Sequence, residues 1–358
     1  MQSQLRDPTG GNTLKTLVVG GFGAGIAWWI SAPVFILIGP ALAVSVAGLW
    51  SVRTAIHPVL RDLCFLVLGV AVGAGFDADA VGVMLRWPLA FAVMLLVIVA
   101  TLLVCRGLLV RLYGFDRRAA ILAAAPGHLS FVVAAATAMQ ADVARISIAQ
   151  SVRLLALTLL IPFVAFGFGI DVSGIILPVG QTMTLFHVSA LLVLGLALGL
   201  LFTRLSLPAP LLLGAMCVSA LGHLSSLTPG YVPDWLLMPA YLVLGALIGT
   251  RFCGVDLSML RRGFLVGMLI TFVAVLFSAL GAVPMAWALG MPPLHVLVAF
   301  APGGLETMIA MGVILGAVPG FVAACHIARL LMLTVLLPVF LAGSAEAAPQ
   351  QDQQRPQR

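Results

Sequence analysis

The sequence predicts an all-α protein that crosses a membrane many times. Of its 358 residues, 62% are hydrophobic and only 8% are charged, and the mean hydropathy is +1.18. The apolar runs approach the roughly 20 residues that an α-helix needs to cross a bilayer, whereas a membrane barrel would show alternating segments of about 10 residues. We therefore expect a multi-pass protein of the cell (inner) membrane, surrounded by the lipid bilayer.

Five spans are expected in the first half of the chain. A polar N-terminal segment, residues 1–13, is expected to be loose, and it precedes a first membrane repeat at residues 14–168. Gly69 and Gly73 give the third span a face of small residues that allows close helix contact. Pro33 marks the bend between the first two spans. The spans are placed at residues 14–32, 33–50, within 57–76, 87–112 and 146–168.

A Pro-Gly sequence interrupts an apolar run once in each half, at residues 125–130 and again at residues 301–306. Proline removes a backbone donor and clashes with the preceding helical turn, and glycine opens conformations that other residues avoid. Backbone groups freed in this way must find partners inside the protein or line a wet cavity. We therefore expect a broken or re-entrant helix in each half.

The two halves are predicted to be an internal duplication. The segment Leu66–Phe76 matches Leu242–Phe252 at six of eleven positions, and Arg153–Phe163 matches Arg329–Val339 at seven of eleven. Both pairs, and the two Pro-Gly sequences, are separated by the same 176 positions. Three matches in one register favour a repeat over coincidence. The second repeat is placed at residues 183–342, after a linker at 169–182 and before a disordered tail at 343–358.

Charge distribution favours inverted repeats. If each Pro-Gly segment enters and leaves the membrane on one side, five full spans remain in each half, and the second half begins on the opposite face. Nearly all basic residues then lie at one face, as the positive-inside rule requires for cytoplasmic loops. Both termini are predicted to be cytoplasmic. Only Arg86 lies at the other face, together with Asp77, Asp79, Asp171 and Asp234.

Inverted repeats with interrupted helices are the architecture of many secondary transporters, in which half-helix ends meet a solute or ion near the midplane. A carboxylate inside an apolar run is costly, so Glu306 is predicted to have a role with a solute, a proton or a partner. The alternatives are a proline kink used only for packing, and a structural carboxylate paired to an arginine. The candidate residues at the two breaks are Pro126, Gly127, His128, Ser130, Pro302, Gly303, Gly304 and Glu306.

Two arginines at matching positions, Arg153 and Arg329, lie inside apolar helices. They are interpreted either as structural, pairing with carbonyls, or as binding an anionic group through their forked donors. Gln150 and His326 lie one turn earlier. Each is interpreted as a polar contact to the opposite half, and His326 alternatively as a hydrogen-bonded contact of its own helix or as a proton carrier. Asp142 is interpreted as a cap of the arginine helix.

Other chemistries find no support in the sequence. The glycines between Gly20 and Gly25 miss the spacing of a dinucleotide-binding loop, so they are interpreted as a close-packing face. Neither a metal motif nor a grouped catalytic triad is present, so we expect no cofactor and no enzymatic activity. Direct nucleic-acid binding is not expected. The cysteines are interpreted as buried thiols; they are Cys64, Cys105, Cys217, Cys253 and Cys325.

The repeated pattern resembles the AbrB-type duplicated membrane family, over about residues 14–342. It consists of Pro-Gly-(Gly)-Leu, then Gln/His-x-x-Arg-Leu-Leu and a Leu-x-Pro end. The second half carries Glu306 and Met308 where the family has an acidic residue and a methionine. The first half departs at His128, where the family usually has glycine, and the second half departs at His326, where glutamine is usual. Members are often labelled ammonia monooxygenases or AbrB-family transcriptional regulators.

These labels imply chemistry that the residues do not provide. Ammonia oxidation needs copper or another redox centre, and direct regulation of DNA needs a soluble base-reading module. The resemblance therefore implies at most an indirect effect on gene expression.

Two functions remain open. One is secondary transport of a small solute or ion, with Glu306 and His326 as candidate coupling residues and the arginines balancing charge. The other is a membrane-embedded sensor or regulator that binds a ligand without moving it. The solute, the coupling ion and the oligomeric state, including a homodimer, are left open.

Overall fold

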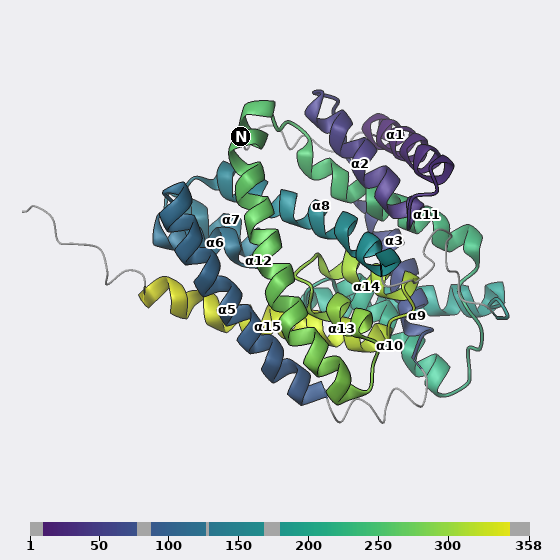
Figure 1. Cartoon of the computed structure of the whole chain (residues 1–358). Coiled ribbons are helices and arrows are strands. Elements are labelled where there is room, and N and C mark those ends of the chain that lie inside the picture. Colours follow the sequence, from purple (N-terminus) through teal and green to yellow (C-terminus); the bar gives the residue numbers. More distant parts are fainter. Residues whose placement is uncertain (1–9, 77–86, 127–128, 168–179, 344–358) are drawn as a thin grey trace, which may run out of the picture.

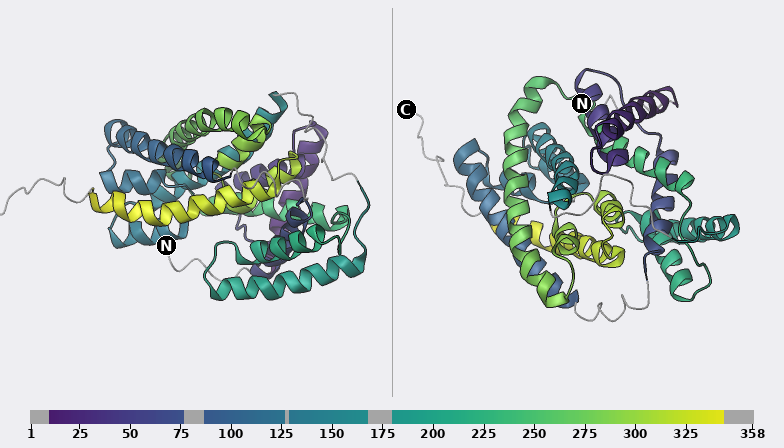
Figure 2. Two further views of the ribbon diagram at one scale, coloured as in Figure 1. Left: turned by 90° about the horizontal axis from the view of Figure 1, so that it is seen from below. Right: turned by 45° about the vertical axis from the view of Figure 1, so that its right-hand side comes forward.

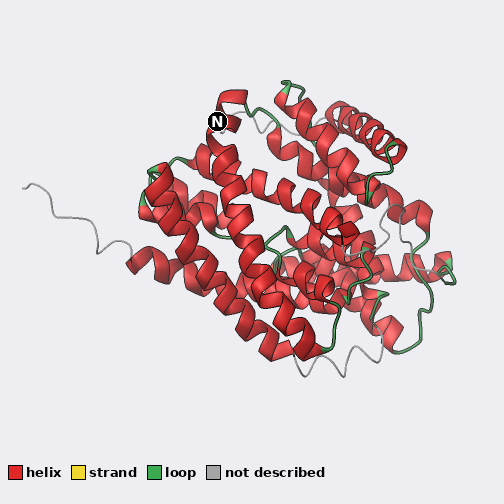
Figure 3. Ribbon diagram, in the orientation of Figure 1, coloured by secondary structure: helices red, strands yellow, loops and turns green. Residues whose placement is uncertain are grey.

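The protein is all-helical throughout the part of the chain that the computed structural model describes, which comprises residues 10–76, 87–126, 129–167 and 180–343. These residues form 14 α-helices and one 3₁₀ turn, and they contain no strand, as Figure 3 shows. Their β-structure is limited to an isolated bridge between Thr182 and Tyr231. The all-α prediction is therefore confirmed.

The first half supplies seven of these helices. Three come before the gap at residues 77–86 and four after it. They are α1 (Gly10–Trp29), α2 (Phe35–Leu49), α3 (Pro58–Gly73), α5 (Trp87–Tyr113), α6 (Arg117–Ala124), α7 (Leu129–Ala138) and α8 (Val143–Gly167).

The second half supplies the other seven and the 3₁₀ turn. They are α9 (Leu185–Arg204), α10 (Pro210–Leu224), α11 (Asp234–Gly249), η2 (Thr250–Phe252), α12 (Leu257–Leu289), α13 (Pro293–Phe300), α14 (Leu305–Ile314) and α15 (Pro319–Gly343).

Six of the described helices are long and apolar enough to cross a membrane: α5, α8, α9, α11 with η2, α12 and α15. Helices α2 and α10 are apolar but shorter, with 15 residues each. A length of 15 residues corresponds to about 22 Å at 1.5 Å per residue, which is less than the roughly 30 Å of a hydrocarbon core. The protein is thus membrane-embedded, with apolar helices of unequal length.

Helix bounds recur along the chain at the spacing that relates the sequence repeats. Helix α3 begins at Pro58 and α11 at Asp234, and the bounds of α6, α7 and α8 recur in α13, α14 and α15. Adding 176 to each bound of those four first-half helices gives the bounds of its counterpart. Each half therefore forms these four helices in the same order and at the same spacing.

The helices form two groups, each with members from both halves (Figures 1 and 2). In one group, α2 packs on α11 while α3 packs on α10, and α1 and α9 lie outside them against α2 and α10. In the other group, α8 packs on α12 and α15 on α5. Each of these four contacts between the halves thus has a counterpart in which the two halves exchange roles.

Small residues allow this close packing, as the sequence predicts for the third span. A Cβ added at Gly69 or Gly73 would collide with the carbonyl of Leu212 or Met216 on α10. A Cβ added at their counterparts Gly245 and Gly249 would collide in the same way with the backbone of α2. Glycine is therefore required where α3 and α11 cross the other half.

Two sequence predictions need correction here. Helix α1 begins at Gly10, within the segment expected to be loose, because Thr13 Oγ1 accepts a hydrogen bond from His57 N at 3.0 Å. Cys253 is exposed, and Cys217 is partly exposed. Cys253 directly follows the 3₁₀ turn, where the chain leaves the packed helices.

The close-packing interpretation of the first-span glycines holds at Gly23. A side chain there would collide with the backbone of Gly39 on α2. By contrast, Gly21 and Gly25 have open space where a Cβ would be. The close contact therefore concerns one face of α1 only.

Candidate functional site

The helices stop at both Pro-Gly sequences. Helix α6 ends at Ala124 and α7 begins at Leu129, while α13 ends at Phe300 and α14 begins at Leu305. Pro126 and Pro302 are both buried in the non-helical connections. Gly127 and His128 lie outside the described residues, and Ser130 belongs to α7, although its side chain is not described.

Gln150 and Arg153 of α8 bind the end of α6. The Gln150 amide nitrogen Nε2 donates to the carbonyls of Leu122, Ala123 and Ala125 at 3.0, 3.2 and 2.8 Å. Arg153 Nη1 donates to Ala125 O at 3.2 Å. The last carbonyls of a helix have no partner within it. These two side chains therefore supply hydrogen-bond donors to the carbonyls that are free at the end of α6.

Arg329 of α15 plays the same part in the second half. Its Nη1 donates to Ala301 O at 2.8 Å and its Nη2 to Gly303 O at 3.1 Å. His326 does not take the role of Gln150, because its Nδ1 contacts Val322 O of its own helix at 2.9 Å. The hydrogen bonds of Gln150 and His326 stay within their own half, so the predicted polar contact to the opposite half is wrong for these bonds. The other interpretation of His326, as a hydrogen-bonded contact of its own helix, is confirmed.

Ser278 of α12 also binds the end of α13, a role that the sequence did not predict. Its Oγ donates to Phe300 O at 3.1 Å, and the residue is fully buried. A lone serine in an apolar helix gives no distinctive sequence signal, because a serine hydroxyl usually bonds within its own helix. The matching position in the first half is Leu102, so comparing the repeats gives no signal either.

Glu306 lies in the first turn of α14 and is half-buried. It forms no ion pair with any described residue. A carboxylate in the first turn of a helix is favoured by the helix dipole. The position therefore accounts for a charged Glu306 without a direct basic partner.

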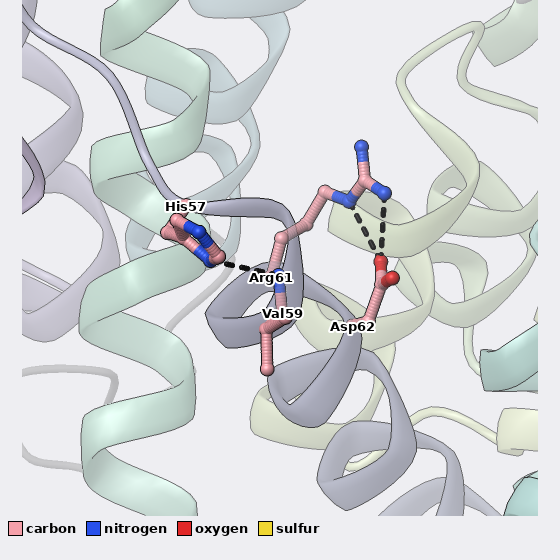
Figure 4. A network of polar contacts seen from close by, with 4 residues as sticks. All are labelled: His57, Val59, Arg61 and Asp62. Atoms are coloured by element: carbon pink, nitrogen blue, oxygen red, sulfur yellow. Dashed lines mark hydrogen bonds and ion pairs between the residues drawn. The ribbon is translucent and has the colours of Figure 1, made fainter. Parts of the chain in front are cut away.

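Neither of the two inner arginines has a carboxylate partner in the described part of the chain. Arg153 and Arg329 are each 1% exposed, and the Nε of each has no hydrogen-bond partner; His326 Nε2 also lacks one. The one ion pair among the described residues joins Arg61 and Asp62 at 2.8 Å on the surface of α3 (Figure 4). Buried charges are normally paired, so the inner arginines stand out.

The two halves meet at this point. Gly304 faces the side chain of Leu154, the residue after Arg153 on α8. Arg329, in the same half as Gly304, binds the carbonyl of Gly303, the residue directly before it. The predicted site residues Arg153, Gly304 and Arg329 thus belong to one region, with Gln150 and Glu306 on the same elements.

A cavity opens beside the outer ends of α6 and α7. It has a volume of about 450 Å³, and its lining comes from the loop before α6, the start of α6, the loop after α7 and the start of α8. Arg145 lines it and donates from Nη2 to Tyr113 O at 3.0 Å. Asp142 accepts from Arg145 N at 3.0 Å, which confirms its predicted capping role.

The chain is an all-helical membrane protein whose sequence matches a known family. Residues 36–343 match the family described as transition state regulatory protein AbrB. The chain therefore belongs to this family, as its motifs indicate.

Two curated relatives match most of the chain. A protein of Bacillus subtilis (strain 168) named "Uncharacterized protein YhjN" is 27% identical, covering 77% of this chain and 76% of the relative. A protein of Escherichia coli (strain K12) named "Putative regulator AbrB" is 26% identical, covering 89% of this chain and 92% of the relative.

Proposed function

We propose that this protein is a secondary transporter, and not an enzyme, that binds a small solute or ion where its two Pro-Gly breaks cross. The observation that carries the proposal is the buried polar region at these breaks. Arg153 and Arg329 bind the free carbonyls there, and Gly304 of one half lies against α8 of the other. Irregular backbone at membrane depth is tolerated where protein buries it or where it lines a cavity.

Inverted repeats follow in this proposal from the cavity beside α6 and α7. The residues before α6 and those after α7 line one cavity, which supports a hairpin that returns to the side from which it entered. Each half then crosses the membrane an odd number of times, so the second half is upside down. The reciprocal packing of α2 on α11 and α3 on α10 fits a two-fold relation between the halves.

The polar residues divide into two roles in this proposal. Glu306 and His326 carry the coupling proton or ion, since neither is held by a charged partner among the described residues. Arg153 and Arg329 hold the ends of α6 and α13 and balance the charge. The solute lies between the two breaks, as in other transporters with discontinuous helices.

A sensor or regulator without transport is the second candidate. The name of the Escherichia coli relative, a regulator, favours it. The same buried site would then bind a ligand and pass its state to a cytoplasmic partner. Both termini are cytoplasmic in either case, by the positive-inside argument.

Proteoliposomes with an imposed proton or sodium gradient test the choice. We expect wild-type protein to give saturable, gradient-driven uptake for at least one member of a panel of small organic acids, inorganic anions, amino acids and sugars. Glu306→Gln should abolish the coupling, whereas the surface control Asp62→Asn should not. Full coupling in Glu306→Gln would contradict the assigned role, and the absence of saturable flux across the panel would favour the sensor.

A further inference from the structure

We infer that the ligand of the site at the two breaks is a small anion, bound by the free backbone amides that open α14 and by donors of the buried arginines. A carboxylate and an inorganic anion share the required chemistry. The inference rests on the proposed function only for the location of the site, because binding can be measured without any flux.

The first step concerns the helix ends with negative polarity. The end of α6 is bound by Gln150 and Arg153, and the end of α13 by Ser278 and Arg329. Carbonyls at such ends are the groups that would coordinate a cation. Side-chain donors already bind the carbonyls from Leu122 to Ala125 at the end of α6, and those of Phe300 and Ala301 at the end of α13, so fewer carbonyls remain free for a cation.

The second step concerns the helix end with positive polarity. The backbone N–H groups of Gly304, Leu305, Glu306 and Thr307 have no acceptor among the described residues; the next amide, Met308 N, bonds to Gly304 O at 2.9 Å. Gly304 caps α14 without a side-chain hydrogen bond. Free amides at a helix N-terminus form an anion site.

The third step is independent of the helix end. Arg153 and Arg329 are each 1% exposed, and each keeps an unpartnered Nε. Arg329 binds Gly303 O at 3.1 Å, directly before the free amides of α14. The two inner arginines outnumber the one carboxylate, Glu306, so positive charge is in excess in the region, and a buried uncompensated charge is costly. A bound anion would satisfy both the charge and the donors.

Thermal unfolding of the full-length protein in nanodiscs tests the inference. Sodium chloride, sodium phosphate and sodium acetate are each compared with bulky sodium gluconate at equal sodium concentration, and uncharged acetamide serves as the isostere of acetate. A ligand that binds only the folded state raises the melting temperature in a saturable way. We expect such a rise with at least one small anion and none with acetamide.

Two variants and one control locate the effect. Gly304→Ala would place a Cβ 3.3 Å from Thr307 Oγ1 and 3.8 Å from Leu154 Cδ2, which fills space beside the free amides and requires the Thr307 side chain to shift by a few tenths of an ångström. Arg329→Lys keeps the charge and loses the Nε donor. Each should raise the half-saturating anion concentration at least tenfold, whereas Gly107→Ala, which has open space at its Cβ position, should not change it.

The outcomes separate the two proposals. No difference between the small anions, gluconate and acetamide would overturn the anion site, as would an unchanged half-saturating concentration in both Gly304→Ala and Arg329→Lys. Saturable anion binding without flux would support the site and reject transport. Gradient-driven flux of a cation or neutral solute, with no anion effect on unfolding, would support transport and reject the anion.

Discussion

Arg153 Nη2 donates to Gln150 Oε1 at 2.6 Å, so the two side chains hold the end of α6 as one unit. The Gln150 amide nitrogen is then turned toward three carbonyls of α6 and the break. No equivalent pair forms in the second half, where His326 is bonded to its own helix. The two breaks are therefore built on one plan but are held differently.

Gln150→Ala should destabilise the protein because it leaves buried carbonyls without donors. Loss of a partner for a buried polar group costs about 1–3 kcal/mol. The free energy of unfolding in denaturant, measured in one detergent, should fall by roughly that amount. The exposed helical control Ser189→Ala should change it little. Equal stability of Gln150→Ala and wild type would show that water or Arg153 replaces the lost donor.

His326→Gln should make the hydrogen bonding at the second break resemble that at the first. Glutamine at this position can extend toward the end of α13, as Gln150 does toward α6, and it removes the ring whose Nε2 has no partner. We expect a higher melting temperature than wild type. A large destabilisation would instead show that the ring fills its fully buried position in a way that glutamine cannot.

The order and type of the helices could be predicted from the sequence because apolar runs and repeats are local patterns. The predicted span at residues 87–112 corresponds to α5, Trp87–Tyr113. The start of α1 could not be predicted, because Thr13 and Thr16 are fixed by Ala55 N and His57 N, about 40 positions away. The candidate arginines could be predicted from their cost in lipid, but not their carbonyl partners, which depend on how the breaks fold.

Gly69→Val and Gly245→Val should both disrupt the packing between the halves. A Cβ at Gly69 would collide with the carbonyl of Leu212 on α10, and a Cβ at Gly245 with the carbonyl of Leu37 on α2. Overpacking costs typically 1–3 kcal/mol or more, so both variants should lower the melting temperature markedly. Gly107→Val, on the open side of α5, should not. Tolerance at only one of the two glycines would contradict equivalent packing in the halves.

His223→Ala should release the loop between α10 and α11. The ring contacts Ser219 O through Nδ1 at 2.7 Å and Gly230 O through Nε2 at 2.9 Å. Without the ring, amides at residues 225–233 should exchange faster in hydrogen–deuterium exchange mass spectrometry. Ser225→Ala, whose hydroxyl bonds only within the last turns of α10, should leave that rate unchanged.

Asp256 should make the start of α12 sensitive to acid. Its pKa is lowered mainly by the hydrogen bond from Met259 N and then by that from the Ser258 hydroxyl. A depressed pKa contributes stability above the unfolded value, about 3.9, and this stability is lost as pH falls through the folded pKa. Asp256→Asn keeps a capping oxygen but does not titrate. The melting temperature of the wild type should therefore fall relative to that of the variant only below about pH 4.

Cysteine accessibility tests the inverted topology directly. Cys253, which is exposed, and Cys217, which is partly exposed, are first replaced by serine. One cysteine at a time is then introduced by Arg117→Cys, Arg261→Cys or Asp234→Cys, all at exposed positions. In oriented vesicles, a membrane-impermeant maleimide should label positions 117 and 261 from the cytoplasmic side and position 234 from the other. The reason is that five crossings and a returning hairpin in each half put both arginine-rich loops on one face. Labelling of positions 117 and 261 from opposite sides would mean that α6 and α7 cross the bilayer together, which makes the halves parallel and separates the two breaks from a shared site.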